Sequence, residues 1–138
     1  MPRKIKHIYF ADDDPDDYFL FKSTLLEIDN AVLVSYFRHC DELLKNLESS
    51  SELPDIIVLD LNMPGNDGQR CLIILKTDSR LQHIPVVMYS TSNHELAIKT
   101  AYSNGAHKYI VKPNSIEKLK TILNDILAID LDSPVPVK

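Results

Sequence analysis

Short apolar runs alternate with longer amphipathic stretches along this chain. The runs at 5–11, 31–37, 56–59, 85–89 and 108–111 are rich in aliphatic and aromatic side chains, which is typical of β-strands. The run at 56–59 (IIVL) is apolar at every position, as in a strand that is buried on both faces. The pattern therefore predicts five strands, with the third in the interior of a sheet.

Amphipathic stretches lie between these runs and predict helices. Asp14 followed by Pro15 is a good helix start, because aspartate caps a first turn and proline suits the first helical position. Phe21, Leu25 and Ile28 then recur at the spacing of one helical face. We expect further helices over 41–48, around 71–75, over 94–103 and from about 116 to 127.

Two of these helices have recognisable ends. The helix over 94–103 stops near Asn104-Gly105, a typical helix terminator. Residues 114–117 (NSIE) open the last helix with a capping-box-like spacing. We expect the inner face of that last helix to consist of Ile116, Leu119, Leu123, Ile126 and Leu127.

A strand followed by a helix, repeated along the chain, predicts an α/β fold. The repeat calls for a parallel sheet with right-handed crossovers and helices on both faces. Such open sheets bind ligands outside the carboxyl ends of their strands, where the strand order reverses. Polar residues that act in chemistry should therefore lie directly after the strands.

The composition is that of one globular domain. The chain has 138 residues, 44% of them hydrophobic, and its 15 basic and 20 acidic residues give a net charge of −5. That length suits a single domain with its own core. No stretch has the apolar length of a membrane span or the features of a signal peptide, and Cys40 and Cys71 make neither a disulfide framework nor a CxxC site. We expect a cytoplasmic protein.

The negative charge is concentrated at one place. Five aspartates lie close together near the start of the chain, and without them the acidic residues would equal the 15 basic ones. These aspartates are Asp12, Asp13, Asp14, Asp16 and Asp17. The basic residues are scattered, so we expect neither a nucleic-acid nor a membrane partner. The local acidic excess instead indicates a cation site.

Polar residues follow four of the predicted strands. They are Asp12-Asp13-Asp14, Asp60, Ser90-Thr91-Ser92 and Lys112-Pro113. Two carboxylates about 5 Å apart repel each other by about 3 kcal/mol at an effective dielectric near 20, so a hard cation such as Mg²⁺ is favoured between them. A lysine beside them could hold a phosphoryl oxygen, and a carboxylate could attack phosphorus to form an aspartyl phosphate.

These motifs together resemble the receiver domain of two-component response regulators. The similarity rests on Asp12-Asp13, on Asp60 within 60–68 (DLNMPGNDG), on Ser90 and on Lys112-Pro113, all in the family's order and spacing. The resemblance is to chemotaxis-type receivers that consist of a single domain.

The resemblance covers residues 5–128 and implies the architecture of the chain. It implies a flavodoxin-like (βα)5 fold of three layers, with a five-stranded parallel sheet in the order 2-1-3-4-5. We expect a receiver domain over 1–128 and a short C-terminal tail over 129–138. That tail is too short to hold an output domain.

The resemblance also implies a metal site and an acceptor. Asp60 would be the phosphoacceptor, and Mg²⁺ would be bound by Asp13, Asp60 and the backbone carbonyl of Asn62. Asp12 would join the metal through water or orient the site.

Further residues are implied around the phosphoryl group. Lys112 would pair with the phosphoryl group or with Asp60, and Ser90 would hydrogen-bond a phosphoryl oxygen. The bond between Lys112 and Pro113 is expected to be cis, an isomer that requires proline. Tyr109 would change rotamer as the Ser90 hydroxyl moves, coupling the site to the surface of the fourth and fifth helices and the fifth strand.

Three neighbouring residues are expected to adjust the chemistry. Asn62 and Ser92 match positions that tune aspartyl-phosphate hydrolysis in the family, and neither is an acid that could serve as a strong general base. Thr91 replaces the usual alanine or glycine and should narrow the entrance. A similar run of hydroxyl residues occurs in single-domain receivers, some of them partnered with phytochrome-like kinases.

The implied function is that of a stand-alone receiver in a phosphorelay. A sensor histidine kinase or phosphotransfer protein would donate the phosphoryl group to Asp60, and modification would switch a surface that binds a downstream protein. A homodimer through the helix 4–strand 5–helix 5 face is a further expectation. The protein would not be an enzyme, apart from catalysing its own phosphorylation and dephosphorylation.

Other classes fit the motifs less well. A haloacid-dehalogenase-type phosphatase needs threonine or valine where Asp16 stands. An EF-hand calcium loop beginning at Asp60 fails at Pro64 and at Cys71, where the bidentate glutamate should be. A degenerate receiver that binds partners without phosphate is disfavoured by the intact Asp60 and Lys112.

Several conspicuous residues have ordinary structural interpretations. Asp14, Asp16 and Asp17 are interpreted as first-turn carboxylates favoured by the helix dipole. Asp67-Gly68 is interpreted as turn and cap chemistry, and the two cysteines as small apolar side chains of the core.

Overall fold

The structure, a computed structural model, describes residues 4–132 and consists of one parallel sheet between two layers of helices. The strands, in the spatial order β2-β1-β3-β4-β5, are β1 (His7–Ala11), β2 (Leu33–Phe37), β3 (Ile56–Leu59), β4 (Val86–Ser90) and β5 (Lys108–Val111). The helices are α1 (Pro15–Ile28), α2 (Cys40–Ser49), the 3-10 helix η1 (Pro64–Asn66), α3 (Asp67–Thr77), α4 (Glu95–Ser103) and α5 (Ile116–Leu127). The predicted α/β fold and its strand order are confirmed.

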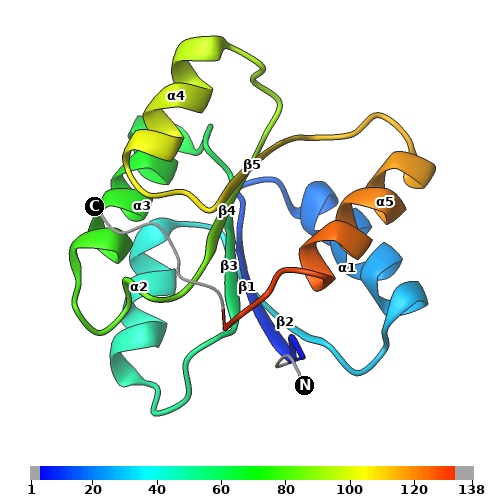
Figure 1. The fold of residues 1–138 in the computed structure, drawn as a ribbon, viewed down its shortest axis with the longest axis horizontal. Helices are drawn as coiled ribbons and strands as arrows, with labels where there is room; N and C mark the ends of the chain where they lie inside the picture. Colours follow the sequence, from blue (N-terminus) through cyan, green and yellow to red (C-terminus); the bar gives the residue numbers. More distant parts are fainter. Residues whose placement is uncertain (1–3, 133–138) are drawn as a thin grey trace.

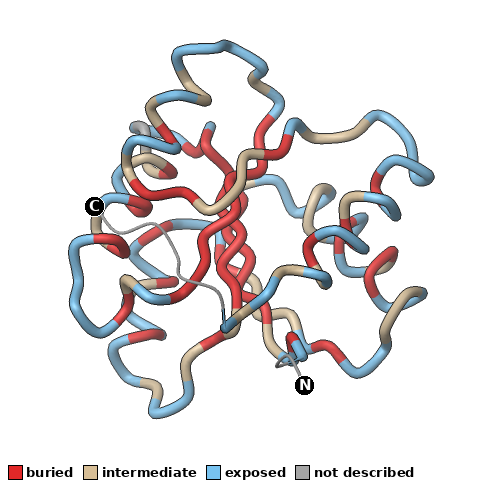
Figure 2. The backbone as a smooth tube through the Cα atoms, viewed as in Figure 1, coloured by how far each residue is buried: buried red, intermediate tan, exposed pale blue. Residues whose placement is uncertain are grey.

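The helices divide between the two faces of the sheet. Figure 1 shows α1 and α5 on one face and α2, α3 and α4 on the other. Side chains alternate along β1, so Ile8 and Phe10 belong to the core under α1 and α5, whereas Tyr9 and Ala11 belong to the core under the other helices. Every residue of β3 is buried, as its apolar run predicts, and Figure 2 shows the buried residues concentrated along the sheet.

Local sequence determines where the helices begin and end. Asp14 caps α1 by accepting a 2.9 Å hydrogen bond from the backbone N–H of Asp16, and Pro15 opens the helix as predicted. After α4 the chain turns at Gly105, whose φ of 100° is in the left-handed region. A Cβ at Gly105 would lie 3.0 Å from Cγ of Lys76, so the close packing also favours glycine there.

The start of α5 differs from the expectation in two ways. Ser115 is the N-cap and accepts a 3.2 Å hydrogen bond from the N–H of Lys118, so the third helical position carries lysine and the reciprocal glutamate contact of a capping box is not made. Ile116 is 46% exposed, and its neighbours in the first turn of α5 are exposed as well, so this position does not belong to the inner face. Leu119, Leu123 and Ile126 are buried as predicted.

The predicted tail begins with packed residues. Ile129 and Leu131 contact the core under α1 and α5, while 133–138 lie outside the described residues. Among the helices of 4–132, none has the length and apolar character required to cross a membrane.

Candidate functional site

Two neighbouring strands bring the acidic residues together. β1 and β3 pair in parallel with Ala11 opposite Leu59, so Asp12 and Asp60 leave the sheet side by side. The N–H of Asp60 donates to the carbonyl of Ala11 at 2.8 Å and completes this alignment. Asp12, Asp13 and Asp60 each place a possible ligand atom within 4.8 Å of the others. Three carboxylates at this separation fit a hard divalent cation such as Mg²⁺.

The electrostatics of the cluster also favour a bound cation. Burial raises the pKa of Asp12 to about 7, although hydrogen bonds from the N–H of Asp14 and from Lys112 oppose the shift. Burial likewise raises the pKa of Asp60, against a 3.1 Å hydrogen bond from the N–H of Asn62. Both carboxylates are therefore costly to ionise without a positive partner.

A pair of aromatic residues holds the backbone of the acidic cluster. The Tyr36 hydroxyl, at the end of β2, donates a 2.8 Å hydrogen bond to the backbone carbonyl of Asp12. The Tyr18 ring stacks on Tyr36 with ring centroids 4.1 Å apart. Burial, followed by the negative charge of Asp12, raises the pKa of Tyr36, so its hydroxyl stays a donor. Tyr36 thus fixes the position of Asp12 from outside the cluster.

Lys112 reaches the cluster from the end of β5. Its ammonium lies 2.9 Å from Asp12 Oδ2, 2.7 Å from Asp17 Oδ2 and 3.7 Å from Asp60 Oδ1. Desolvation lowers the pKa of this group, but the hydrogen bonds that it donates to Asp17 and Asp12 outweigh this effect and raise the pKa above its ordinary value. Lys112 therefore stays cationic beside the Asp60 carboxylate.

The expected cis bond before Pro113 is wrong for this structure. The Lys112–Pro113 bond is trans, and the described range 4–132 contains no cis peptide. The trans isomer of such a bond is favoured by about 0.5–1 kcal/mol. With it, the N–H of Lys112 still donates to the Ser90 carbonyl at 2.7 Å and the ammonium still reaches the carboxylates.

The Ser90 hydroxyl is held by two donors at the end of β4. Its oxygen accepts hydrogen bonds from the side-chain amide of Asn62 at 2.9 Å and from the N–H of Ser92 at 3.1 Å. The Asn62 amide also donates to the Thr91 hydroxyl at 3.2 Å. The contacts from Asn62 and from Ser92 both use the Ser90 oxygen as acceptor, so the Ser90 hydroxyl hydrogen can be donated to a further group.

Tyr109 connects β5 to the loop after β4. Its hydroxyl donates a 2.7 Å hydrogen bond to the Ser92 carbonyl, and its N–H donates to the Tyr102 hydroxyl at 3.0 Å. The half-buried ring thus contacts the same loop that holds the Ser90 oxygen. This arrangement joins the hydroxyl site to the surface of α4 and β5.

Asp17 belongs to the site, which the sequence interpretation missed. It was expected to be only a first-turn carboxylate, yet it makes the shortest contact to Lys112, at 2.7 Å. Helical spacing was the available signal that Asp17 could reach the acidic cluster. Asp17 follows the cap residue Asp14 by three positions, so the two residues lie on the same side of the first turn of α1. Asp16, one position earlier, is exposed.

Residues 67 and 68, at the start of α3, support the backbone around Asp60. Asp67 accepts a 2.7 Å hydrogen bond from the N–H of Cys40 and so joins α3 to the start of α2. A Cβ at Gly68 would lie 2.3 Å from the Asp60 carbonyl oxygen, so only glycine lets α3 begin here. Cys71 is fully buried in α3, which excludes the calcium-loop alternative.

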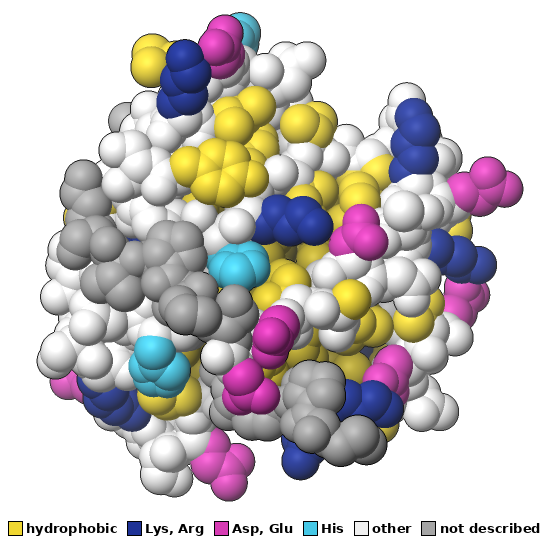
Figure 3. Space-filling view, in the orientation of Figure 1, with side chains coloured by type: hydrophobic (Ala, Val, Ile, Leu, Met, Phe, Trp, Pro, Cys, Tyr) yellow, Lys and Arg dark blue, Asp and Glu magenta, His cyan; other side chains and the backbone are white. Residues whose placement is uncertain are grey.

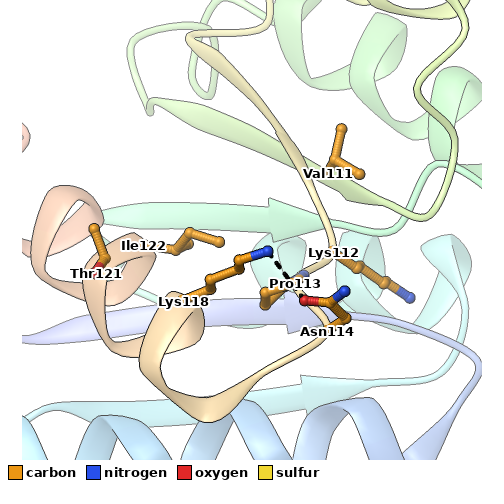
Figure 4. A pocket seen from close by; sticks show the side chains of 7 residues that line it. All are labelled: Val111, Lys112, Pro113, Asn114, Lys118, Thr121 and Ile122. Atoms are coloured by element: carbon orange, nitrogen blue, oxygen red, sulfur yellow. Dashed lines mark hydrogen bonds between the residues drawn. The ribbon is translucent and has the colours of Figure 1, made fainter.

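A hollow lies beside this chemical site. It has a volume of about 520 Å³ next to β5 and α5, where Lys118 donates a hydrogen bond to Asn114 and the Lys112 side chain points away from the other lining residues (Figure 4), toward Asp12. Its lining consists of Val111, Lys112, Pro113, Asn114, Lys118, Thr121 and Ile122. On the face seen in Figure 3, acidic and basic side chains are interspersed, which agrees with balanced charge away from the acidic run.

Similar proteins share this architecture. The phosphorylated cyanobacterial phytochrome response regulator RcpA superposes with a TM-score of 0.83 at 30% identity, covering 96% of this chain and 99% of RcpA. The two-component response regulator ORR13 of Oryza sativa subsp. japonica is 31% identical over 87% of this chain and 97% of its own length.

A further relative is longer than this chain. The probable methanogenesis regulatory protein FilR2 of Methanothrix harundinacea is 40% identical over 54% of this chain, and the match covers 48% of FilR2. The family model described as "Response regulator receiver domain" matches residues 8–124. This chain belongs to the response regulator receiver domain family.

Proposed function

We propose that this protein accepts a phosphoryl group on Asp60 from a sensor histidine kinase or a phosphotransfer protein, in a Mg²⁺-dependent step. The observation that supports this most strongly is the cluster of Asp12, Asp13 and Asp60, with ligand atoms within 4.8 Å of one another, beside the Lys112 ammonium. A buried carboxylate between a cation site and a lysine is suited to attack phosphorus.

Asp13, Asp60 and the backbone carbonyl of Asn62 would hold Mg²⁺, with Asp12 joined through water. A bound Mg²⁺ supplies positive charge to the phosphoryl oxygens. The Asp60 carboxylate forms the new O–P bond while the P–N bond of the donor phosphohistidine breaks, and the imidazole leaves. Asp60 can act only when ionised, so the cation and Lys112 together offset the burial that raises its pKa.

Two donors would hold the transferred group. The Lys112 ammonium approaches Asp60 to 3.7 Å and contacts a phosphoryl oxygen once the group is attached. The Ser90 hydroxyl donates its free hydrogen to another phosphoryl oxygen. Since Tyr109 is bonded to the Ser92 carbonyl, movement of this loop toward the phosphoryl group releases or reorients Tyr109 and changes the surface of α4, β5 and α5.

This switched surface would bind a downstream protein or a second copy of the chain. Asn62 and Ser92 would set the hydrolysis rate of the acyl phosphate, and neither carries a carboxylate that could activate water. The receiver domain would span 1–128 of a cytoplasmic protein in a two-component phosphorelay. Donors of the phytochrome type are the first to test, because RcpA, a phytochrome response regulator, covers nearly the whole chain.

The central test is phosphoryl transfer from a small donor. With acetyl phosphate and Mg²⁺, we expect wild-type protein to gain one phosphoryl group by intact-mass spectrometry, removable by hydroxylamine as an acyl phosphate is. Asp60→Asn should gain none, and chelation of Mg²⁺ should stop the wild-type reaction. Asp16→Asn, which removes an exposed carboxylate, is the matched control and should react like wild type. Labelling of Asp60→Asn, or full activity in chelator, contradicts the proposal.

A further inference from the structure

The Lys112 ammonium divides its contacts unequally among three carboxylates. It lies 2.7 Å from Asp17 and 2.9 Å from Asp12, both within hydrogen-bond distance, but 3.7 Å from Asp60. The group that must stabilise the transferring phosphoryl group is therefore bound mainly to two other residues. Asp12 takes part in the cation cluster, whereas Asp17 lies outside it on the first turn of α1.

We infer that Asp17 is a positioning residue that holds Lys112 away from the acceptor in the unmodified protein and competes with the phosphoryl group for it. This inference rests on the proposed function. In the unmodified state Asp17 keeps the ammonium on the α1 side of the site. Because the ammonium lies 3.7 Å from Asp60, it moves toward the acceptor and away from Asp17 during transfer, so Asp17 slows uptake.

The surroundings of the pair allow this movement. The Asp17 side chain is 29% exposed and that of Lys112 is 10% exposed, so the contact lies at the border of the site. A hollow of about 260 Å³ adjoins both residues and is also lined by Leu20, Tyr89 and Ile116. The ammonium lies 5.6 Å from the centre of the Tyr89 ring, a contact that stays favourable while the lysine exchanges carboxylate for phosphoryl.

Charge acts in the same direction as geometry. Four carboxylates, those of Asp12, Asp13, Asp17 and Asp60, gather around the Lys112 ammonium, while the Arg38 guanidinium contacts the backbone carbonyl of Asp13 at 3.5 Å. Each carboxylate adds negative charge that disfavours the approach of a phosphodonor anion. Neutralising Asp17 removes one of those charges and frees one lysine hydrogen bond. For a partly exposed pair, we expect phosphoryl uptake to become about five-fold faster.

The experiment compares initial rates of phosphoryl uptake from acetyl phosphate at saturating Mg²⁺. Asp17→Asn should react about five-fold faster than wild type, mainly through a higher maximal rate. Asp17→Glu keeps the negative charge and should take up phosphoryl groups as slowly as wild type. Asp16→Asn removes the same charge one residue earlier and should stay at the wild-type rate. A rate for Asp17→Asn at or below wild type, or equal acceleration in Asp16→Asn, overturns the inference.

A second readout uses the wild-type protein alone. The nuclear Overhauser effect between the Lys112 ammonium and the Asp17 side chain should be present in unmodified protein and disappear after phosphorylation. Its persistence in the phosphorylated protein overturns the inference. A purely structural role for Asp17 would lower the melting temperature of Asp17→Asn without raising its rate. If wild-type protein takes up no phosphoryl group, the proposed function itself fails, and that result is distinct from an unaltered rate in Asp17→Asn.

Discussion

Two largely shielded lysines lie at opposite edges of the same sheet and have opposite electrostatic properties. At the carboxyl edge, Lys112 is surrounded by carboxylates, and Asp17 and Asp12 raise its pKa despite its burial. At the amino edge, Lys76 is fully buried and donates to two backbone carbonyls, that of Ile84 at 2.7 Å and that of Gln82 at 2.9 Å. Burial lowers the pKa of Lys76 to about 8.

The difference shows that the partners of a lysine, neutral carbonyls or carboxylates, decide whether its charge is available to a ligand. Lys76 has only neutral carbonyl partners, which hold the segment before β4 in place, and Gly105 packs closely on its side chain. Its positive charge is costly there, because no anion compensates it within this contact. Lys112 has more carboxylates around it than it can neutralise, so its charge remains available for an incoming anion.

The largest expected effect compares methionine substitutions at the two lysines. Lys112→Met should slow phosphoryl uptake from acetyl phosphate by about 100-fold or more, because a preorganised cation at the reacting group is lost. Lys76→Met should leave that rate within about two-fold of wild type, since it removes no charge from the site. Intact-mass time courses measure both. Equal loss in the two variants would mean that Lys112 acts only through stability.

The pH dependence of stability should also separate the two lysines. Folded Lys76 has a pKa of about 8 instead of the ordinary 10.5, so between these values the unfolded chain binds more protons and stability rises with pH. The rise should amount to about 3 kcal/mol and be absent in Lys76→Met. Lys112, whose pKa is raised, loses its stabilisation only at still higher pH. Urea unfolding of wild type and of Lys76→Met at several pH values tests this prediction. An equal dependence of the free energy of unfolding on pH in the two proteins would refute it.

A smaller effect is expected where β2 supports the carboxyl edge. Tyr36→Phe deletes the 2.8 Å hydrogen bond to the Asp12 carbonyl and should weaken Mg²⁺ binding about three-fold, as measured by isothermal titration calorimetry. Ser35→Ala is the matched control. Ser35 lies next to Tyr36 on β2, and the substitution deletes its 2.7 Å hydrogen bond with His7 of β1, away from the cluster. The support assigned to Tyr36 is wrong if both variants bind Mg²⁺ equally well.

The fold and the meeting of the main site residues were predictable from the sequence. Parallel strands share one carboxyl edge, so Asp12, Asp60 and Lys112 were expected at that edge, and the strand order implied by the resemblance placed β1 next to β3. Apolar runs are strong signals for such buried strands, as at Ile56–Leu59. The resemblance to a family then supplied roles that periodicity alone does not give.

The rest depended on three-dimensional detail that the pattern does not contain. The contact of Asp17 depends on the rotation of α1 and on a lysine 95 positions away. Burial of Lys76 depends on the loop that folds over it before β4. The intrinsic preference of a bond before proline for trans is only about 0.5–1 kcal/mol, so the local sequence at Lys112-Pro113 does not by itself determine the isomer.

The first turn of α3 and the acceptor backbone are in direct contact. A Cβ at Gly68 would lie 2.3 Å from the Asp60 carbonyl oxygen, so α3 cannot move closer to this backbone without displacing Asp60. Asp67 links the same end of α3 to α2 by accepting a hydrogen bond from the N–H of Cys40. Pressure on the outer surface of α2 and α3 would therefore reach the backbone of Asp60 without any contact in the acidic cluster.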